Sequence, residues 1–148
     1  MWKLRDPNQR LLNWKQFRKR LNGLDLETAL QETVDYWCSP PWAPFYLDEE
    51  DPNSWPAPWD LIVDNYFCDI AKALGMVYTI YLTDHQPDIK LNIYREPDTG
   101  CNLALVVINR KYVLNMNSGQ VLNRQYIEDS LQLRYTYNVK ELNLEKYI

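Results

Sequence analysis

The segment from residue 53 to residue 83 constrains the fold more than any other part of the chain, because it has the pattern of a buried helix followed at once by a buried strand. Pro58 suits the first turn of a helix. Apolar residues recur every three or four positions over residues 59–74, the spacing that lines one helical face. Gly75 is typical of a helix end, and residues 76–82 are rich in strand-forming types. We therefore predict a helix over 59–74 and a strand over 76–82.

The flanking segments predict an α+β fold. Residues 14–21 and 26–37 each carry an apolar stripe at helical spacing, which predicts a helical hairpin. After residue 82 the apolar period changes from helical to two, and four more strands are expected at 89–94, 103–108, 112–116 and 131–137. The expected architecture is an N-terminal helical hairpin, a central buried helix and then an antiparallel sheet of four to five strands.

The 148 residues are predicted to form a single domain with a core that needs no disulfide or metal. It divides into a helical hairpin (1–38), an aromatic-proline strap (39–58), a core of helix plus antiparallel sheet (59–138) and a C-terminal tail (139–148), which is either a short helix or an arm. No run approaches the roughly 20 apolar residues of a membrane span, and the charged N-terminus lacks a signal-peptide segment. The three cysteines are expected to be reduced thiols in a cytoplasm.

The strap combines six prolines with large aromatic side chains. Its prolines prevent regular structure, yet it is too aromatic for a disordered linker. Two interpretations stay open: the strap wraps its own core, or it presents a surface to a partner. Interfaces favour large aromatic anchors and arginine. The interface candidates, drawn from the strap and from both ends of the chain, are Trp42, Phe45, Tyr46, Trp55, Trp59, Arg18, Lys19 and Tyr147.

The net charge of −4 hides a strong asymmetry along the chain. The first 20 residues are basic, whereas residues 21–71 contain no lysine or arginine and many acids. Such a basic head and acidic middle either pair within the fold, join two copies in a homo-oligomer, or form ordinary solvated helix faces. The acidic middle opposes a polyanion, so nucleic acid is an unlikely partner.

The sequence predicts no cofactor and no metal. His85 is the only histidine, and the four glycines are too scattered for a phosphate-binding loop. The acidic run at 48–51 lacks the alternating ligands and the glycine of a calcium loop.

The order of helix, Leu74-Gly75, strand and hairpin resembles the core of transglutaminase-like and papain-like enzymes. In that family a cysteine opens the helix, and a histidine and an aspartate follow on two later strands. The resemblance places the histidine position near residues 101–103 and the aspartate position at Asn115. Cys68 is expected in the middle of the predicted helix, where the helix dipole gives it little help. The resemblance therefore implies a catalytically degenerate core without catalytic residues. The alternative is a cysteine-dependent hydrolase or amidase that uses Cys68 with His85.

A second resemblance covers nearly the whole chain. The stretches RDPNQRLLNWKQFR, DLETALQETVDYW, DPNSWPAPWDLIVDNYFCDIAKALGMVYT and KYVLNM are similar to a small uncharacterised protein family of contractile-tailed phages, including marine and cyanobacterial ones. This resemblance implies a non-enzymatic structural protein of the virion or its assembly, with tail or baseplate favoured, located in the virion and in the host cytoplasm during assembly. Its partners would be other phage structural proteins. A further alternative is a phage protein that binds and modulates a host protein.

Overall fold

The computed structural model describes residues 1–127 and 129–147 and confirms the α+β class. Helices come first in this part of the chain, and an antiparallel sheet follows. The α-helices are α1 (Pro7–Leu21), α2 (Leu26–Tyr36), α3 (Pro58–Asp64) and α4 (Asp69–Tyr81). The strands are β1 (Ile89–Arg95), β2 (Asn102–Ile108), β3 (Tyr112–Leu114), β4 (Leu122–Asn123) and β5 (Gln132–Asn138). Short 3-10 turns form η1 (Pro52–Ser54), η2 (Arg124–Tyr126) and η3 (Leu144–Tyr147).

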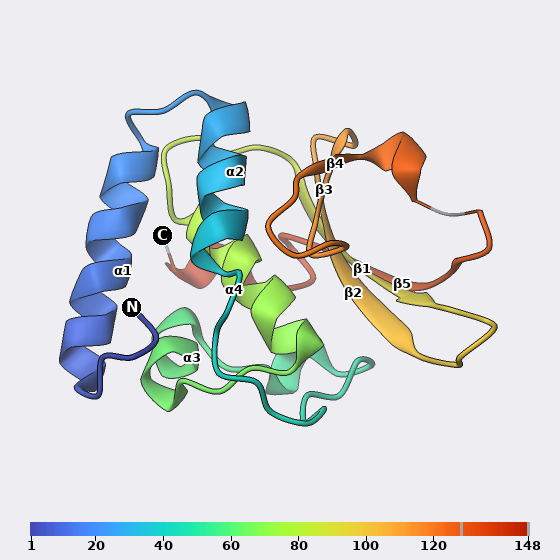
Figure 1. The fold of residues 1–148 in the computed structure, drawn as a ribbon, viewed down its shortest axis with the longest axis horizontal. Coiled ribbons are helices and arrows are strands. Elements are labelled where there is room, and N and C mark those ends of the chain that lie inside the picture. Colours follow the sequence, from blue (N-terminus) through green and yellow to red (C-terminus); the bar gives the residue numbers. More distant parts are fainter. Residues whose placement is uncertain (128, 148) are drawn as a thin grey trace.

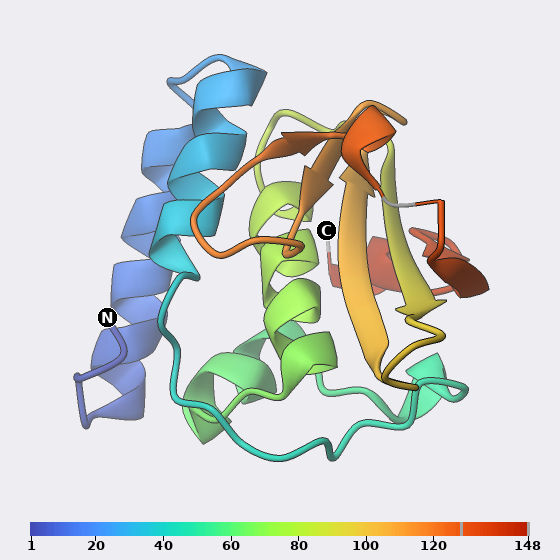
Figure 2. The same ribbon diagram turned by 45° about the vertical axis from the view of Figure 1, so that its right-hand side comes forward.

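The sheet has the order β4-β3-β2-β1-β5, and each neighbouring pair is antiparallel. The helices gather on one side of the sheet, and α4 lies between the sheet and the α1–α2 hairpin (Figures 1 and 2). The strap leaves the end of α2 and passes beneath α4 towards the sheet (Figure 2). The cleft described below is bordered by this strap, by the start of α4 and by one end of the sheet.

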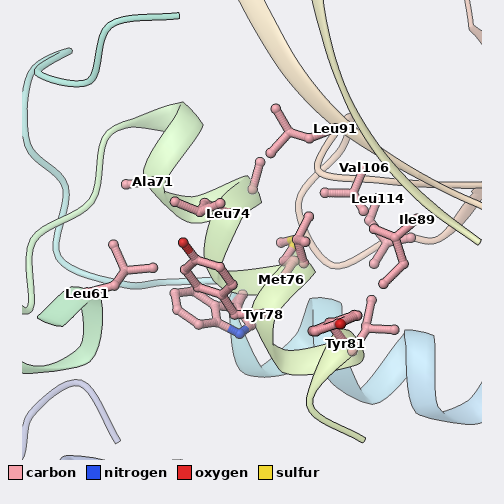
Figure 3. Close-up of a cluster of buried hydrophobic side chains, with 14 of the residues drawn as sticks. Leu61, Ala71, Leu74, Met76, Tyr78, Tyr81, Ile89, Leu91, Val106 and Leu114 are labelled. Atoms are coloured by element: carbon pink, nitrogen blue, oxygen red, sulfur yellow. The ribbon is translucent and has the colours of Figure 1, made fainter. Parts of the chain in front are cut away.

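The main hydrophobic core surrounds α4, which is buried along most of its length. Side chains of α4 such as Leu74 and Met76 lie close to strand residues Leu91, Val106 and Leu114 (Figure 3). A helix that is apolar on all sides belongs in the interior, between two layers. A smaller cluster, built on Tyr94, Leu105, Val107 and Val113, forms a second core.

The predicted single helix and the strand after it are wrong in detail. The chain leaves α3 at Asn65, which has a left-handed backbone with φ of 54°, and starts again as α4 at Asp69. This second helix runs through Gly75, and the strand-forming residues after Gly75 are therefore helical. Gly75 is not a helix end. A Cβ atom there would lie 2.2 Å from the ring of Trp37, so glycine allows α2 and α4 to approach closely. Burial between two layers outweighs the strand preference of the side chains.

One hydroxyl group joins three helices. The indole nitrogens of Trp14 in α1 and Trp37 in α2 each donate a hydrogen bond of 3.0 Å to Oγ1 of Thr79 in α4. The same hydroxyl donates to the carbonyl of Gly75 at 2.7 Å. All of these side chains are buried, so the bonds satisfy polar atoms that would otherwise be costly. The hairpin is therefore fixed to the central helix by specific bonds as well as by apolar packing.

The remaining elements agree with the predictions to differing degrees. The helical hairpin is present, although α1 starts earlier than expected because Asp6 caps it and Pro7 occupies its first turn. The four later strands lie where they were predicted, and β4 completes the sheet in place of the strand expected over 76–82. The tail ends in the turn η3, with Leu144 buried and Tyr147 packed near Tyr78. Residue 148 of the predicted tail lies outside the described residues. Among the helices within residues 1–127 and 129–147, none combines the length and the apolar character that a membrane span requires.

Candidate active site

Cys68 lies at the beginning of α4, as its N-cap residue. Its backbone is extended, with φ of −80° and ψ of 178°, and the helix starts at the next residue. The prediction that Cys68 lies in the middle of a helix is therefore wrong. The left-handed Asn65 ends α3 and allows the chain to extend at residues 66–68 before it becomes helical again. The helix N-terminus, with its unpaired N–H groups and positive dipole end, is thus at Cys68.

The strap holds the chain in place just before this cysteine. The amide of Phe67 donates to the carbonyl of Pro41 at 2.9 Å, and the amide of Ala43 donates to the carbonyl of Phe67 at 3.1 Å. These two bonds form a parallel bridge between Trp42 and Phe67. Regular helix bonding is interrupted here, so the strap supplies the partners that the backbone around Cys68 needs. The sequence did not indicate this contact, because its two sides are 25 positions apart in the chain.

Asp69 and Asn115 connect the start of α4 to the sheet. Asp69 Oδ2 accepts from the amide of Ala104 at 2.9 Å, and Asp69 Oδ1 accepts from Asn115 Nδ2 at 3.1 Å. Asn115 Nδ2 also donates to the carbonyl of Ala104 at 2.9 Å. Burial of the carboxylate raises the pKa of Asp69, although much of the residue's surface is open to solvent, and the two hydrogen bonds oppose this rise. The family's aspartate position is thus occupied by an asparagine, whose amide fixes the residue next to Cys68.

The position expected for a histidine bears none. Cys101 and Asn102 lie there, at the start of β2, and Asn102 Nδ2 donates to the carboxylate of Glu49 in the strap. His85 follows the other end of α4, and its Nε2 lies 2.8 Å from the carbonyl oxygen of Leu21. The 13 residues of α4 span about 20 Å at the usual helical rise. The structure therefore does not bring His85 and Cys68 together.

A cleft of about 810 Å³ opens beside Cys68, and we call it the Cys68 cleft. Strap residues form one part of its wall, and α4 and β2 supply the rest. Its lining residues are Trp42, Ala43, Phe45, Asp48, Glu49, Glu50, Cys68, Asp69, Cys101 and Asn102. Cys68 itself is only 2% exposed. A second hollow of about 260 Å³ adjoins the same cysteine and includes Cys38 and Lys72. Cys68 thus contributes to the walls of both hollows although it is almost fully buried.

The interface candidates fall into separate groups in the structure. Trp42, Phe45 and Tyr46 are exposed, and the first two line the Cys68 cleft. Trp55 is buried in the main core. Tyr147 is half-buried beside Tyr78.

Trp59, Arg18 and Lys19 lie together around a different hollow of about 460 Å³, between α1 and α3. The Arg18 guanidinium lies over the rings of Trp14 and Trp59, 4.3 and 5.8 Å from their centroids. Burial lowers the pKa of Arg18. The candidates therefore do not form one continuous surface.

Several residues of this site were not on the predicted list. Asp69 was missed, Glu49 was considered only as part of the acidic run at 48–51, and Cys101, Asn102 and Asn115 were named only as departures from the family pattern. The available signal was the Asp64-Asn65 pair, since asparagine is a frequent left-handed residue at helix ends. A helix restarting after that pair would have placed an acid, Asp69, in its first turn, where acids are favourable.

Comparison with known proteins identifies the fold. No family model and no curated protein matches the sequence. Among solved structures, calcium-bound LapG of Legionella pneumophila matches with a TM-score of 0.72 over 91% of this chain and 77% of LapG, at 13% sequence identity. LapG is a transglutaminase-like cysteine protease, and the likeness shows a transglutaminase-like fold for this chain.

This match corrects the functional prediction. We expected a non-enzymatic structural protein of a phage particle, and the fold shared with LapG contradicts this expectation. The prediction failed because the expected unbroken helix placed Cys68 away from any helix terminus, and an active-site arrangement was therefore discounted. With Cys68 at the start of α4, the cysteine-dependent alternative fits the molecule better.

The calcium in the LapG structure has no evident counterpart here. Within residues 1–127 and 129–147, no group of three or more histidine, cysteine or acidic side chains converges in a way that could hold a metal ion. The acidic run at 48–51 directs its carboxylates to separate partners, such as Asn102 for Glu49 and Tyr135 for Glu50. The residues present do not fit a calcium site, so we derive no chemical step through a metal.

Proposed function

We propose that this chain is a cysteine-dependent hydrolase or amidase in which Cys68 is the nucleophile. The observation that carries the proposal is the position of Cys68 at the N-terminus of α4, on the wall of the Cys68 cleft. A thiolate is the reactive form of cysteine, and a helix N-terminus favours negative charge. The cleft gives an extended substrate access to the start of the helix. The transglutaminase-like fold supports the same reading.

The proposed chemistry is acyl transfer through a thioester. The Cys68 thiolate attacks the carbonyl carbon of an amide, the carbon–nitrogen bond breaks, and the amine leaves with a proton. Water then attacks the thioester carbonyl, the carbon–sulfur bond breaks, and the acyl group leaves as a carboxylic acid while Cys68 regains its thiol proton. A carboxylate takes the place of histidine as proton acceptor in this scheme. Asp69 is the candidate, because it follows Cys68 directly, lines the same cleft, and has a pKa that burial raises above its ordinary value.

The proposed enzyme differs from a Cys-His-Asp enzyme at two positions. Asn102 lies where the histidine is expected, and Asn115 lies where the aspartate is expected. Asn102 and Asn115 accept no proton from a thiol, so their contribution is to hold Glu49 and Asp69 in place. A carboxylate is a much weaker base than imidazole for a thiol, and we therefore expect slow turnover and a long-lived thioester.

The test asks whether the reactivity of the three cysteines follows their solvent exposure or their position in the proposed active site. Cys38 and Cys101 are exposed, whereas Cys68 is buried, so a non-specific alkylating agent should label the first two. A peptidyl acyloxymethyl ketone, which reacts with nucleophilic cysteines of proteases, should instead label Cys68. Labelling is measured by intact mass and peptide mapping. The variant Cys38→Ser/Cys101→Ser should keep the label, and Cys68→Ser should lose it.

Labelling confined to Cys38 and Cys101 would contradict the proposal and indicate a cleft that binds without reacting. Capture of an acyl-enzyme from a peptide ester, seen as a mass increase on Cys68, would support it directly. A slow second step makes this species the expected one at short reaction times.

The phage family, the virion location and the partners stay predictions from the sequence. Mass spectrometry of purified phage particles would test them, because a virion component would be present at fixed copy number. A cysteine hydrolase that is absent from particles would act inside the infected cell.

A further inference from the structure

The geometry points to a peptide segment with a lysine or arginine side chain as the ligand of the Cys68 cleft. This inference rests on the proposed function for the identity of the site as an active site. The binding itself needs no reaction at Cys68. Two parts of the cleft wall would contact this ligand, one acidic and one aromatic, and both come from the strap.

The acidic part consists of carboxylates that form no ion pair among residues 1–127 and 129–147. Asp48, Glu49 and Glu50 line the cleft, and no lysine, arginine or histidine lines it among the residues that the structure describes. A cleft with charges of one sign concentrates ligands of the opposite sign.

The partners of these acids are neutral groups that hold the carboxylates in position. Glu49 accepts from Asn102 Nδ2, Glu50 accepts from the hydroxyl of Tyr135, and Asp48 Oδ1 accepts from the amide of Glu50 at 2.9 Å. Each bond fixes an oxygen without cancelling its charge. The acids are thus held by strand and strap residues, in contrast to a freely moving surface run.

The aromatic part exposes rings that the core does not use. Trp42 is 78% exposed and Phe45 is 61% exposed, and both line the cleft. The backbone on both sides of Trp42 is bonded to Phe67, so this indole is presented from a fixed position next to Cys68. Aromatic faces attract ammonium and guanidinium groups, and the attraction is strongest for tryptophan. The apolar stem of lysine or arginine would cover the same rings.

Other ligands satisfy only part of this wall. An acidic segment would be repelled by the four carboxylates that line the cleft, those of Asp48, Glu49, Glu50 and Asp69. A purely apolar segment would cover the rings, but it would displace the water that hydrogen-bonds to the carboxylates and would offer no donor in its place. A cationic side chain satisfies both parts at once.

The experiment measures binding to the Cys68→Ala variant, so that it does not depend on catalysis. The probes are three fluorescein-labelled heptapeptides of sequence Gly-Gly-Ala-X-Ala-Gly-Gly, with X as lysine, glutamine or glutamate, titrated by fluorescence anisotropy. We expect the lysine peptide to bind about tenfold more tightly than the glutamine peptide. The glutamate peptide should bind most weakly, and added salt should reduce the difference.

Matched variants locate the effect. Glu49→Gln/Glu50→Gln and, separately, Trp42→Ala should each reduce the preference for lysine. Asp60→Asn/Asp84→Asn makes the same change in net charge at exposed positions outside the cleft lining, and Trp59→Ala removes an exposed indole elsewhere. Both controls should keep the preference. Far-ultraviolet circular dichroism verifies the fold of each variant.

Equal binding of the lysine and glutamine peptides, or no binding of any peptide at millimolar concentration, would overturn the inference. So would a preference that survives Glu49→Gln/Glu50→Gln or is lost equally in the charge control. The proposed function fails in a different experiment, the labelling of Cys68. A cationic preference without labelling would therefore leave this inference standing and remove only the chemistry.

Discussion

The two halves of the strap share prolines and aromatic side chains but lie in opposite environments, and only the inner half carries the acidic run at 48–51. The outer half, residues 39–46, exposes Trp42, Phe45 and Tyr46. The inner half, residues 47–58, buries Leu47 and Trp55 in the main core. Both halves contain prolines and large aromatic side chains. What separates them is the neighbour: the inner half packs on β5, while the outer half is attached through its backbone to Phe67. The inner half therefore anchors the strap in the core, while both halves contribute to the wall of the Cys68 cleft, the outer half with aromatic rings and the inner half with the carboxylates of residues 48–50.

The largest expected difference is between two tryptophans. Trp55 is 8% exposed, its indole nitrogen donates to the carbonyl of Asp48 at 2.7 Å, and its ring meets that of Tyr137 edge to face at 5.4 Å. Trp55→Ala should lower the free energy of unfolding by about 3–5 kcal/mol. Trp42→Ala should change it by less than about 0.5 kcal/mol, because only backbone atoms of Trp42 hold the bridge. Urea unfolding of both variants measures this, and comparable losses would show that the outer half also supports the core.

A second pair repeats the comparison with smaller side chains. Leu47→Ala removes a buried side chain and should cost about 2–3 kcal/mol. Phe45→Ala should cost less than about 0.5 kcal/mol, because its ring is exposed. Thermal unfolding followed by circular dichroism gives the ranking. If Phe45→Ala proved the more destabilising of the two, the division of the strap at residue 46 would be incorrect.

These pairs also show what the sequence could and could not predict. The later strands and the hairpin were predictable, because their apolar periods are local. The division of the strap was not, since both interpretations depended on whether a distant strand, β5, reaches it. The break between α3 and α4 was hidden for a similar reason. Val63 and Tyr66 continue the helical period that predicted one helix, yet both are exposed in the structure. The bonds that replace the helical ones come from the strap, residues far away in the sequence.

The hydroxyl of Tyr137 allows the stability of the strap and the binding of the lysine peptide to be compared in one variant. Tyr137 in β5 donates to the carbonyl of Glu49 at 2.5 Å. Tyr137→Phe keeps the ring against Trp55 and removes only this bond, so it should cost about 1 kcal/mol. The same variant should loosen the acidic part of the cleft and weaken binding of the lysine peptide. Tyr126→Phe, at an exposed tyrosine, serves as the control and should change neither quantity. If Tyr137→Phe lost stability but bound the lysine peptide as tightly as wild type, the hydrogen bond to Glu49 would not be needed to position the acidic part of the cleft.

The smallest expected effect on stability concerns Asp69, which lines the Cys68 cleft together with the outer half of the strap. Its folded pKa is raised above the ordinary value of 3.8, so the folded protein holds its proton more strongly than the unfolded chain does. Its contribution to stability is therefore present at low pH and is lost as the pH rises through the folded pKa. Urea unfolding from pH 3.5 upward should show wild type losing stability relative to Asp69→Asn. Parallel curves for the two proteins would contradict this, and Asp60→Asn controls for an exposed acid in a first helical turn.

The shared hydroxyl of Thr79 has a consequence for local unfolding. Because the indole protons of Trp14 and Trp37 both end on one oxygen atom, neither helix of the hairpin can leave α4 without disturbing the acceptor of the other. The three helices should then open as one cooperative unit, with the two indole protons exchanging with deuterium at closely similar rates. Cys68 lies at the opposite end of α4 from Thr79, so opening of the hairpin would begin away from the cleft.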